Sequence, residues 1–170
     1  MSPSTRTRHR GAGHRRRSRL RRGGADLPQR PRRGQPGIAR AALSAVIAHA
    51  QSRRYPDGTT LVEVPTVQHA LANMDMDTRA AAALLCEAAE VADAGDEGAL
   101  VPLMEATVLC TDVAARVTHG ALEVCGGQGY TPALPIERHL RDARAGAVMA
   151  PTNGVLRTWS GKAISGLPVP

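Results

Sequence analysis

The chain has 170 residues and a net charge of +7, with one Trp, two Tyr and no Phe. This length fits one domain with a hydrophobic core better than two domains, and the aromatic-poor composition favours close-packed helices over a sheet. The three isolated cysteines, the absence of a zinc-binding spacing among the histidines and the absence of a run of about 18 apolar residues argue against a disulfide framework, a metal site and a membrane span. With no apolar stretch after the basic N-terminus, we expect no secretory signal and a soluble, cytoplasmic protein.

The charge is divided unevenly along the chain. Residues 1–36 contain twelve Arg and a single acidic residue, Asp26, whereas residues 37–170 carry a net charge of −4. A segment so poor in apolar residues cannot bury enough surface to offset its loss of entropy on ordering, so residues 1–36 are predicted to be a disordered basic arm. Pro28, Pro31 and Pro36 are also expected to prevent a helix there.

Two interpretations of the arm differ in kind. Its arginines are typical of a segment that binds nucleic-acid phosphates without sequence specificity. However, the arm has no aromatic residues on which bases could stack. Basicity from Arg alone, without Lys, is what a shifted reading frame of GC-rich DNA produces. We therefore favour a frameshifted or wrongly started reading frame fused to a genuine C-terminal domain over a nucleic-acid-binding arm.

From residue 37 onward the pattern is helical. Apolar residues at helical spacing predict a first helix over residues 37–54, which stops before the turn signal Tyr55-Pro56-Asp57-Gly58. A second helix is predicted from Pro65 to about Asp93, because Pro is tolerated in a first turn. The remaining helices are predicted over about residues 99–125, 136–144 and 152–164, with Gly126-Gly127 as a C-terminal stop and a loop at 128–135. Long amphipathic helices joined by short turns predict an all-α, antiparallel helical bundle over residues 37–170.

Three spaced motifs carry a resemblance to a known family. They are VCGGQGY at residues 124–130, PIER at 135–138 and RDAR at 141–144. In this order and spacing, they resemble the C-terminal helical domain of the acyl-CoA dehydrogenase family, and residues 37–74 are similar to the first two helices of that domain. Read without the family, the glycines are a helix C-cap.

The resemblance implies a bundle that packs on a β-domain and on partner subunits, with FAD lying across the subunit boundary. Partners would be acyl-CoA dehydrogenase-like subunits, in a homo- or hetero-oligomer that takes an acyl-CoA substrate only when complete. Simpler interpretations remain for two polar residues: Arg53 could be a cation at a helix C-terminus, and Gln68 a solvated helix residue. The positions that match FAD-contacting residues of the family are Arg53, Gln68, Glu123, Gly126, Gly127 and Thr152.

The chain departs from the family where the reaction needs a base. Family members remove the α-proton of the acyl thioester with a glutamate that follows RDAR, and a general base must reach that proton. Here Ala150 occupies that place, and the family's other location for the base falls near Leu27 or Pro28, so no catalytic residue is assigned. We therefore expect the flavin-contacting domain of an oxidoreductase acting on the CH–CH bond of acyl-CoA thioesters, inactive alone. The alternatives are a non-catalytic partner subunit and a small helical protein that binds nucleic acid through its arm.

Overall fold

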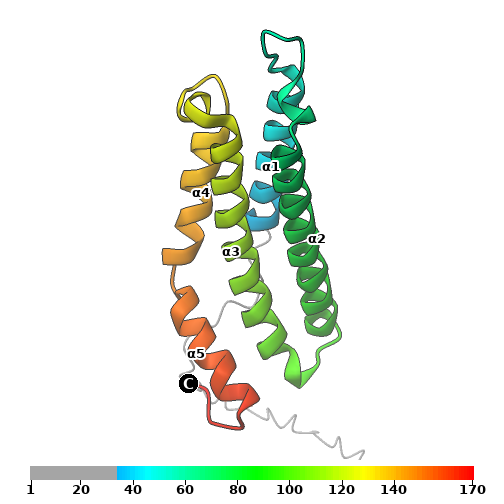
Figure 1. Cartoon of the computed structure of the whole chain (residues 1–170). Coiled ribbons are helices and arrows are strands. Elements are labelled where there is room, and N and C mark those ends of the chain that lie inside the picture. The colour runs from blue at the N-terminus through cyan, green and yellow to red at the C-terminus, as the bar shows by residue number, and fades with distance from the viewer. Residues whose placement is uncertain (1–33) are drawn as a thin grey trace, which may run out of the picture.

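The computed structural model describes residues 34–170, which form an elongated bundle of helices (Figure 1). Apart from an isolated antiparallel bridge between Arg54 and Thr60, these residues contain no strand, which confirms the predicted all-α class. The α-helices are α1 (Gly34–Ser52), α2 (Pro65–Asp93), α3 (Leu100–Cys125), α4 (Ile136–Val148) and α5 (Asn153–Ile164). Short 3-10 helices lie between them: η1 (Leu61–Glu63), η2 (Glu97–Ala99) and η3 (Gly126–Tyr130).

The first helix begins earlier than predicted. It starts at Gly34, and both Gln35 and Pro36 are buried in its first turn. Proline is accepted there because the first backbone N–H groups of a helix have no intrahelical partner to lose. The prediction that Pro36 prevents a helix is therefore wrong. The rest of the predicted disordered arm, together with its possible contact with nucleic acid, lies in residues 1–33, outside the described part of the chain.

Helix α3 forms the centre of the bundle. It packs against α1, α2, α4 and α5, and it lies between the α1–α2 pair and α4 in Figure 1. Small side chains make this close packing possible, and many core positions are alanines with no exposed surface. The fully buried alanines are Ala39, Ala42, Ala50, Ala81, Ala88, Ala106, Ala114, Ala121 and Ala143.

The turn between α2 and α3 is set by one glycine. Gly95 has a φ of 72°, a left-handed value that residues with a side chain rarely adopt. Its N–H donates to the carbonyl oxygen of Ala92 at 3.1 Å, and Asp96 then caps η2 by accepting from the N–H of Gly98 at 2.7 Å. This reverses the chain, so that α2 and α3 run antiparallel.

One stretch, Glu97–Tyr130, is long and apolar enough to cross a membrane by length and composition. Half of its most apolar window is buried inside the bundle, where α3 contributes much of the core. The central helix of a soluble bundle has the same composition, so this stretch is weak evidence for a membrane span.

Candidate functional site

Most of the predicted site residues lie at one end of the bundle, where α1 and α3 end and α2 begins. A small apolar cluster of Ala50, Leu61 and Val67 holds these parts together, and Val124 from the last turn of α3 packs against it. We call this region the arginine–glycine end and define it by Arg53, Gln68, Gly126 and Gly127.

Arg53 follows the last turn of α1 with its backbone fixed on both sides. Its N–H donates to the carbonyl oxygen of His49 at 3.0 Å, and its own carbonyl oxygen accepts from the N–H of Leu61 at 2.9 Å. The side chain is exposed and has no ion pair within residues 34–170. The guanidinium therefore extends from a fixed backbone and remains available to an anionic ligand.

Burial and the positive charge of Arg53 both affect the pKa values of two buried residues, His49 and Cys125. Burial lowers the pKa of His49, and the positive charge of Arg53 lowers it further. Burial raises the pKa of the Cys125 thiol, which Arg53 partly opposes. Cys125 is the last residue of α3 and directly precedes Gly126. His49 Nε2 is buried without a hydrogen-bond partner in the described part.

The three glycines of the GGQGY motif have different roles. Gly126 closes α3 with a φ of 58°, and its N–H donates to the carbonyl oxygens of Leu122 and Glu123. A Cβ added at Gly126 or Gly127 would meet nothing within 4 Å, whereas one at Gly129 would stand 2.7 Å from Leu122 Cδ1. Gly129 therefore packs against α3, while the other two leave open backbone that a ligand can approach closely.

Gln68 and Glu123 make contacts within the domain. Gln68 Nε2 donates to the carbonyl oxygen of Val62 at 3.1 Å and so fastens η1 to α2. Glu123 Oε1 lies 3.5 Å from Nε2 of His119, one turn back along α3. The amide of Gln68 thus supports the turn beside Arg53, and the charge of Glu123 is directed along α3.

Thr152 lies apart from the arginine–glycine end. It is the N-cap of α5, where its Oγ1 accepts from the N–H of Val155 at 3.4 Å. The 13 residues of α4 separate it from η3, a rise of about 20 Å. Ala150, at the family position of the base, is exposed in the segment just before Thr152. The structure thus divides the predicted site into two separate regions of the domain.

Asp112 is a polar centre that lies outside the site predicted from the sequence. Its Oδ1 accepts from Asn153 Nδ2 at 3.1 Å, and its Oδ2 pairs with the guanidinium of Arg157. These contacts join the middle of α3 to the first two turns of α5. The available signal is that Asp112 is the single charged residue between Glu105 and Arg116 of α3.

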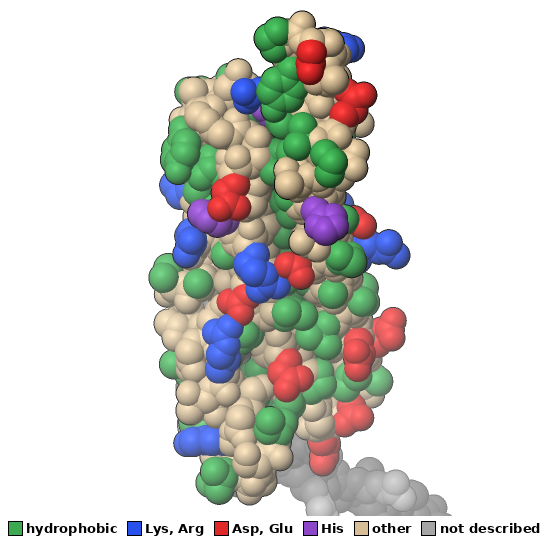
Figure 2. Space-filling view, in the orientation of Figure 1, with side chains coloured by type: hydrophobic (Ala, Val, Ile, Leu, Met, Phe, Trp, Pro, Cys, Tyr) green, Lys and Arg blue, Asp and Glu red, His purple; other side chains and the backbone are tan. Residues whose placement is uncertain are grey.

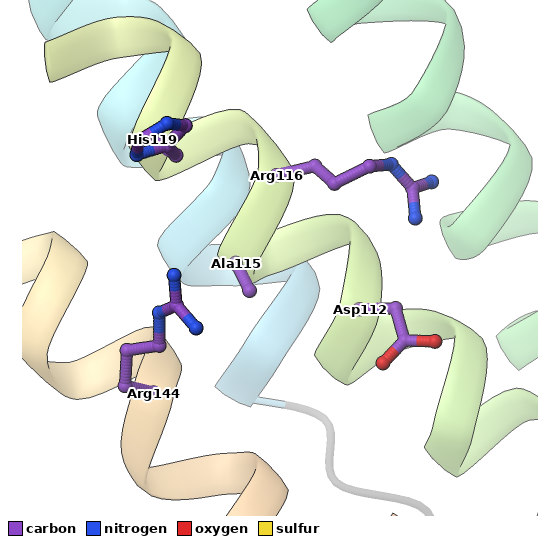
Figure 3. Close-up of a pocket in the computed structure, with 5 residues that line it drawn as sticks. All are labelled: Asp112, Ala115, Arg116, His119 and Arg144. Atoms are coloured by element: carbon purple, nitrogen blue, oxygen red, sulfur yellow. The ribbon is translucent and has the colours of Figure 1, made fainter.

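An open groove of about 320 Å³ lies beside Asp112, between α3 and α4 (Figure 3). Arg144 extends from α4 into it, but Arg116 points away toward α2, where its Nε lies 3.1 Å from Oδ2 of Asp77. The basic residues around the groove therefore do not converge on one point, and we assign no ligand to it.

The remaining surface limits the kinds of ligand that the described part attracts. Residues 34–170 carry a net charge of −4, and acidic side chains are prominent over the lower right of the face in Figure 2. A net negative surface gives no general attraction for nucleic acid. Within the same residues, no group of three or more His, Cys, Asp or Glu side chains is placed to hold a metal ion.

Comparison with known proteins identifies the family. A family model described as "Acyl-CoA dehydrogenase, C-terminal domain" matches residues 30–165. The chain belongs to the acyl-CoA dehydrogenase family. This confirms the resemblance carried by the three motifs and extends it a few residues upstream of α1.

Individual relatives support the same assignment over the helical domain. The chain is 34% identical over 128 residues to cyclohex-1-ene-1-carbonyl-CoA dehydrogenase of Geobacter metallireducens, covering 75% of this chain and 33% of that one. It is 31% identical over 121 residues to the mitochondrial short-chain specific acyl-CoA dehydrogenase of Sus scrofa, covering 71% and 29%. The structure of butyryl-CoA dehydrogenase from Megasphaera elsdenii matches with a TM-score of 0.73 at 33% identity, covering 77% and 34%. The chain thus spans about a third of the length of these acyl-CoA dehydrogenases.

Proposed function

We propose that this chain supplies the flavin-contacting helical domain of an acyl-CoA dehydrogenase-like oxidoreductase. The observation that carries the proposal is the arginine–glycine end, which occurs in a domain of this family. The complete assembly would act on the CH–CH bond of an acyl-CoA thioester, with other domains or subunits supplying the acyl pocket. We further propose that this assembly is cytoplasmic, which cell fractionation can test.

The arginine–glycine end suits a dinucleotide diphosphate. Arg53 offers a guanidinium without an ion-pair partner in residues 34–170, and the open backbone at Gly126 and Gly127 permits close approach. The N-terminus of α2 lies at the same end, and its positive dipole also favours phosphate. These residues fit FAD, which when bound would accept the hydride from the β-carbon of the substrate.

The second region supports a role without catalysis. The α-proton of a thioester needs a base within hydrogen-bond reach, and the methyl group of Ala150 cannot take it. Thr152, two residues on, keeps a hydroxyl at an exposed helix N-terminus. We therefore propose that this chain binds and orients the cofactor, and that it does not remove the α-proton.

Cofactor uptake by an assembled protein tests the proposal. The chain would be co-expressed with the N-terminal two-thirds of a related acyl-CoA dehydrogenase, and the purified complex examined for visible flavin absorbance. We expect a yellow complex in which Arg53→Gln weakens FAD binding about tenfold, the effect of losing one charged hydrogen bond.

A neighbouring residue provides the matched control. The guanidinium of Arg54 is directed into its own turn, with Nη1 3.5 Å from the carbonyl oxygen of Gly58. Arg54→Gln removes the same charge and should bind FAD as the unmodified chain does. A complex without flavin, or an equal loss in both variants, would contradict the proposed role of Arg53.

The absence of a carboxylate at Ala150 favours a second form of the same function. The chain would be a non-catalytic subunit that lends its helices to the flavin site of a complete, active acyl-CoA dehydrogenase. Co-purification with such an enzyme, with flavin bound and with activity supplied by the partner's base, would support this form. A colourless chain that does not associate would rule it out.

A further inference from the structure

We propose that Asp112 is a positioning residue that sets the start of α5, and with it Thr152, for contact with the cofactor. This inference rests on the proposed function, because it assigns a role at the Thr152 region of the same flavin site. The observation behind it is that one carboxylate on α3 holds two residues of α5 that lie one turn apart.

The contacts of Asp112 reach the two positions that define the direction of α5. Asn153 is the first residue of the helix, and Arg157 follows it by four, on the same face. Asn153 is only 5% exposed, so its amide needs an acceptor inside the protein, and Oδ1 of Asp112 provides one. Arg157 then completes the charge balance of the carboxylate.

Thr152 depends directly on this arrangement. It precedes Asn153 in the chain, and it caps α5 through the N–H of Val155, which lies between the two anchored residues. The direction of the Thr152 hydroxyl therefore follows the first turn of the helix. If that turn rotates, the hydroxyl and the neighbouring Ala150 backbone move with it.

The start of α5 is held by an apolar contact as well as by Asp112, because Leu156 in its first turn is fully buried. Helix α5 packs mainly against α3. The segment leading into it is exposed, with Val148 at 76% and Met149 at 58%. A helix that packs mainly against one neighbour opens locally at a lower free energy than the core. The Asp112 contacts are therefore expected to act together with Leu156 in keeping the start of α5 in place.

Hydrogen exchange of the full chain tests the anchoring. Asp112→Asn keeps the size of the side chain and removes the charge that faces Arg157. We expect amide exchange in the first two turns of α5 to quicken about tenfold, consistent with the loss of a charged hydrogen bond, while exchange in α1–α3 stays unchanged. Fluorescence of Trp159, the single Trp of the chain and a residue of α5, should change in parallel.

The matched control breaks a different ion pair of α3, the pair that joins it to α2. Asp77→Asn removes the pair between α2 and Arg116 of α3, and it should leave exchange in α5 unchanged. Exchanging the charges, with Asp112→Arg and Arg157→Asp together, should recover part of the protection that either single change removes. Unchanged exchange in α5 of Asp112→Asn would overturn the proposal.

The proposed effect of Asp112 on cofactor binding is tested by FAD affinity, compared between complexes of equal melting temperature. In the co-expressed complex, we expect Asp112→Asn to weaken FAD binding about tenfold, while the melting temperature stays equal to that of the Asp77→Asn complex. If the unmodified complex binds FAD and the Asp112→Asn complex binds it equally well, this inference fails alone. If the unmodified complex binds no FAD, the proposed function fails, and the cofactor role of Asp112 fails with it.

Discussion

Gln35 in the first turn of α1 lies against Gly146 of α4. A Cβ placed on Gly146 would stand 2.5 Å from Gln35 Nε2 and 3.0 Å from Thr111 Cγ2. The 2.5 Å distance is shorter than two non-bonded atoms tolerate, and the 3.0 Å distance is tighter than most Cβ contacts. Gln35 is only 7% exposed, so its amide has little freedom to withdraw. The absence of a side chain at Gly146 therefore allows α1, α3 and α4 to meet at this point.

We predict that Gly146→Ala destabilises the domain. Forcing one extra carbon into a close-packed helix contact costs about 1–3 kcal/mol, which outweighs the gain of about 1 kcal/mol from the better helix propensity of Ala. Urea unfolding followed by circular dichroism measures the net loss. Gly161→Ala is the control, because a Cβ at this helical position meets nothing within 4 Å, and it should be neutral or stabilising. Equal effects of the two changes would contradict the close contact.

We also predict that stability falls as the solution becomes mildly acidic. The pKa of His49 lies below its ordinary value of 6.5 because of burial and then Arg53. The pKa of His139 is lowered by burial and then by Arg138. With a lower pKa in the folded state, the unfolded chain binds more protons as the pH falls through about 6.5. The stabilisation is thus fully present above this pH and is lost as the pH falls toward the folded-state values.

The histidine contribution is measured by comparing urea midpoints at about pH 7.5 and about pH 5.5. His49→Gln cannot take up a proton, so its midpoint should fall less over this interval than that of the unmodified chain. Adding His139→Gln should flatten the dependence further. A slope that neither change alters would show that the two histidines do not set it.

The thiols are predicted to react at very different rates. Cys86 is exposed, whereas Cys110 and Cys125 are buried. Burial raises the pKa of Cys110 to about 11 and also raises that of Cys125, which leaves little thiolate to react. A thiol-specific chromogenic reagent near neutral pH should modify one cysteine quickly and all three only after unfolding. Cys86→Ser should remove the fast phase, and a fast phase that survives would contradict the burial of the other two.

A carboxylate at the family position is predicted to supply the missing base. In the flavin-containing complex, Ala150→Glu should raise the rate of acyl-CoA oxidation by about 10²–10⁴-fold, the usual contribution of a positioned general base. Ala145→Glu places the same charge on the exposed side of α4 and serves as the control. Dye reduction by a short acyl-CoA measures the rate. Equal rates in the two variants would argue against this segment lying beside the substrate.

Local sequence signals predict the helix boundaries well where a Pro or a Gly marks the start or the end of a helix. Pro65 marks the start of α2, because proline is tolerated in the first turn of a helix. Gly126 marks the end of α3, because glycine readily adopts the positive φ found there. Helix α1 starts at Gly34, before the predicted residue 37, because Pro36 lies in the first turn, where proline does not break a helix. Helix α4 runs to Val148, four residues beyond its predicted end at Arg144, because Gly146 is buried inside the helix and does not end it.

The candidate site was predictable only in part, for a different reason. The family motifs select Arg53 and the glycines by position along the chain, but contacts between helices depend on register that the sequence does not state. Asp112 with Arg157, 45 residues apart, and Gln35 with Gly146 are such contacts. The separation of Thr152 from the arginine–glycine end likewise follows from the length and direction of α4.

The alanine-rich core affects how this domain can be studied by mutation. Alanine scanning measures what a side chain contributes by removing it, yet Ala42, Ala81, Ala114 and Ala121 are already at that end point and are fully buried. The helix contacts made at these positions are therefore not measured by such a scan. Replacements by Gly and by Ser or Val at these positions would report on them, and the larger side chains should be the more harmful because close-packed helices have no space to receive them.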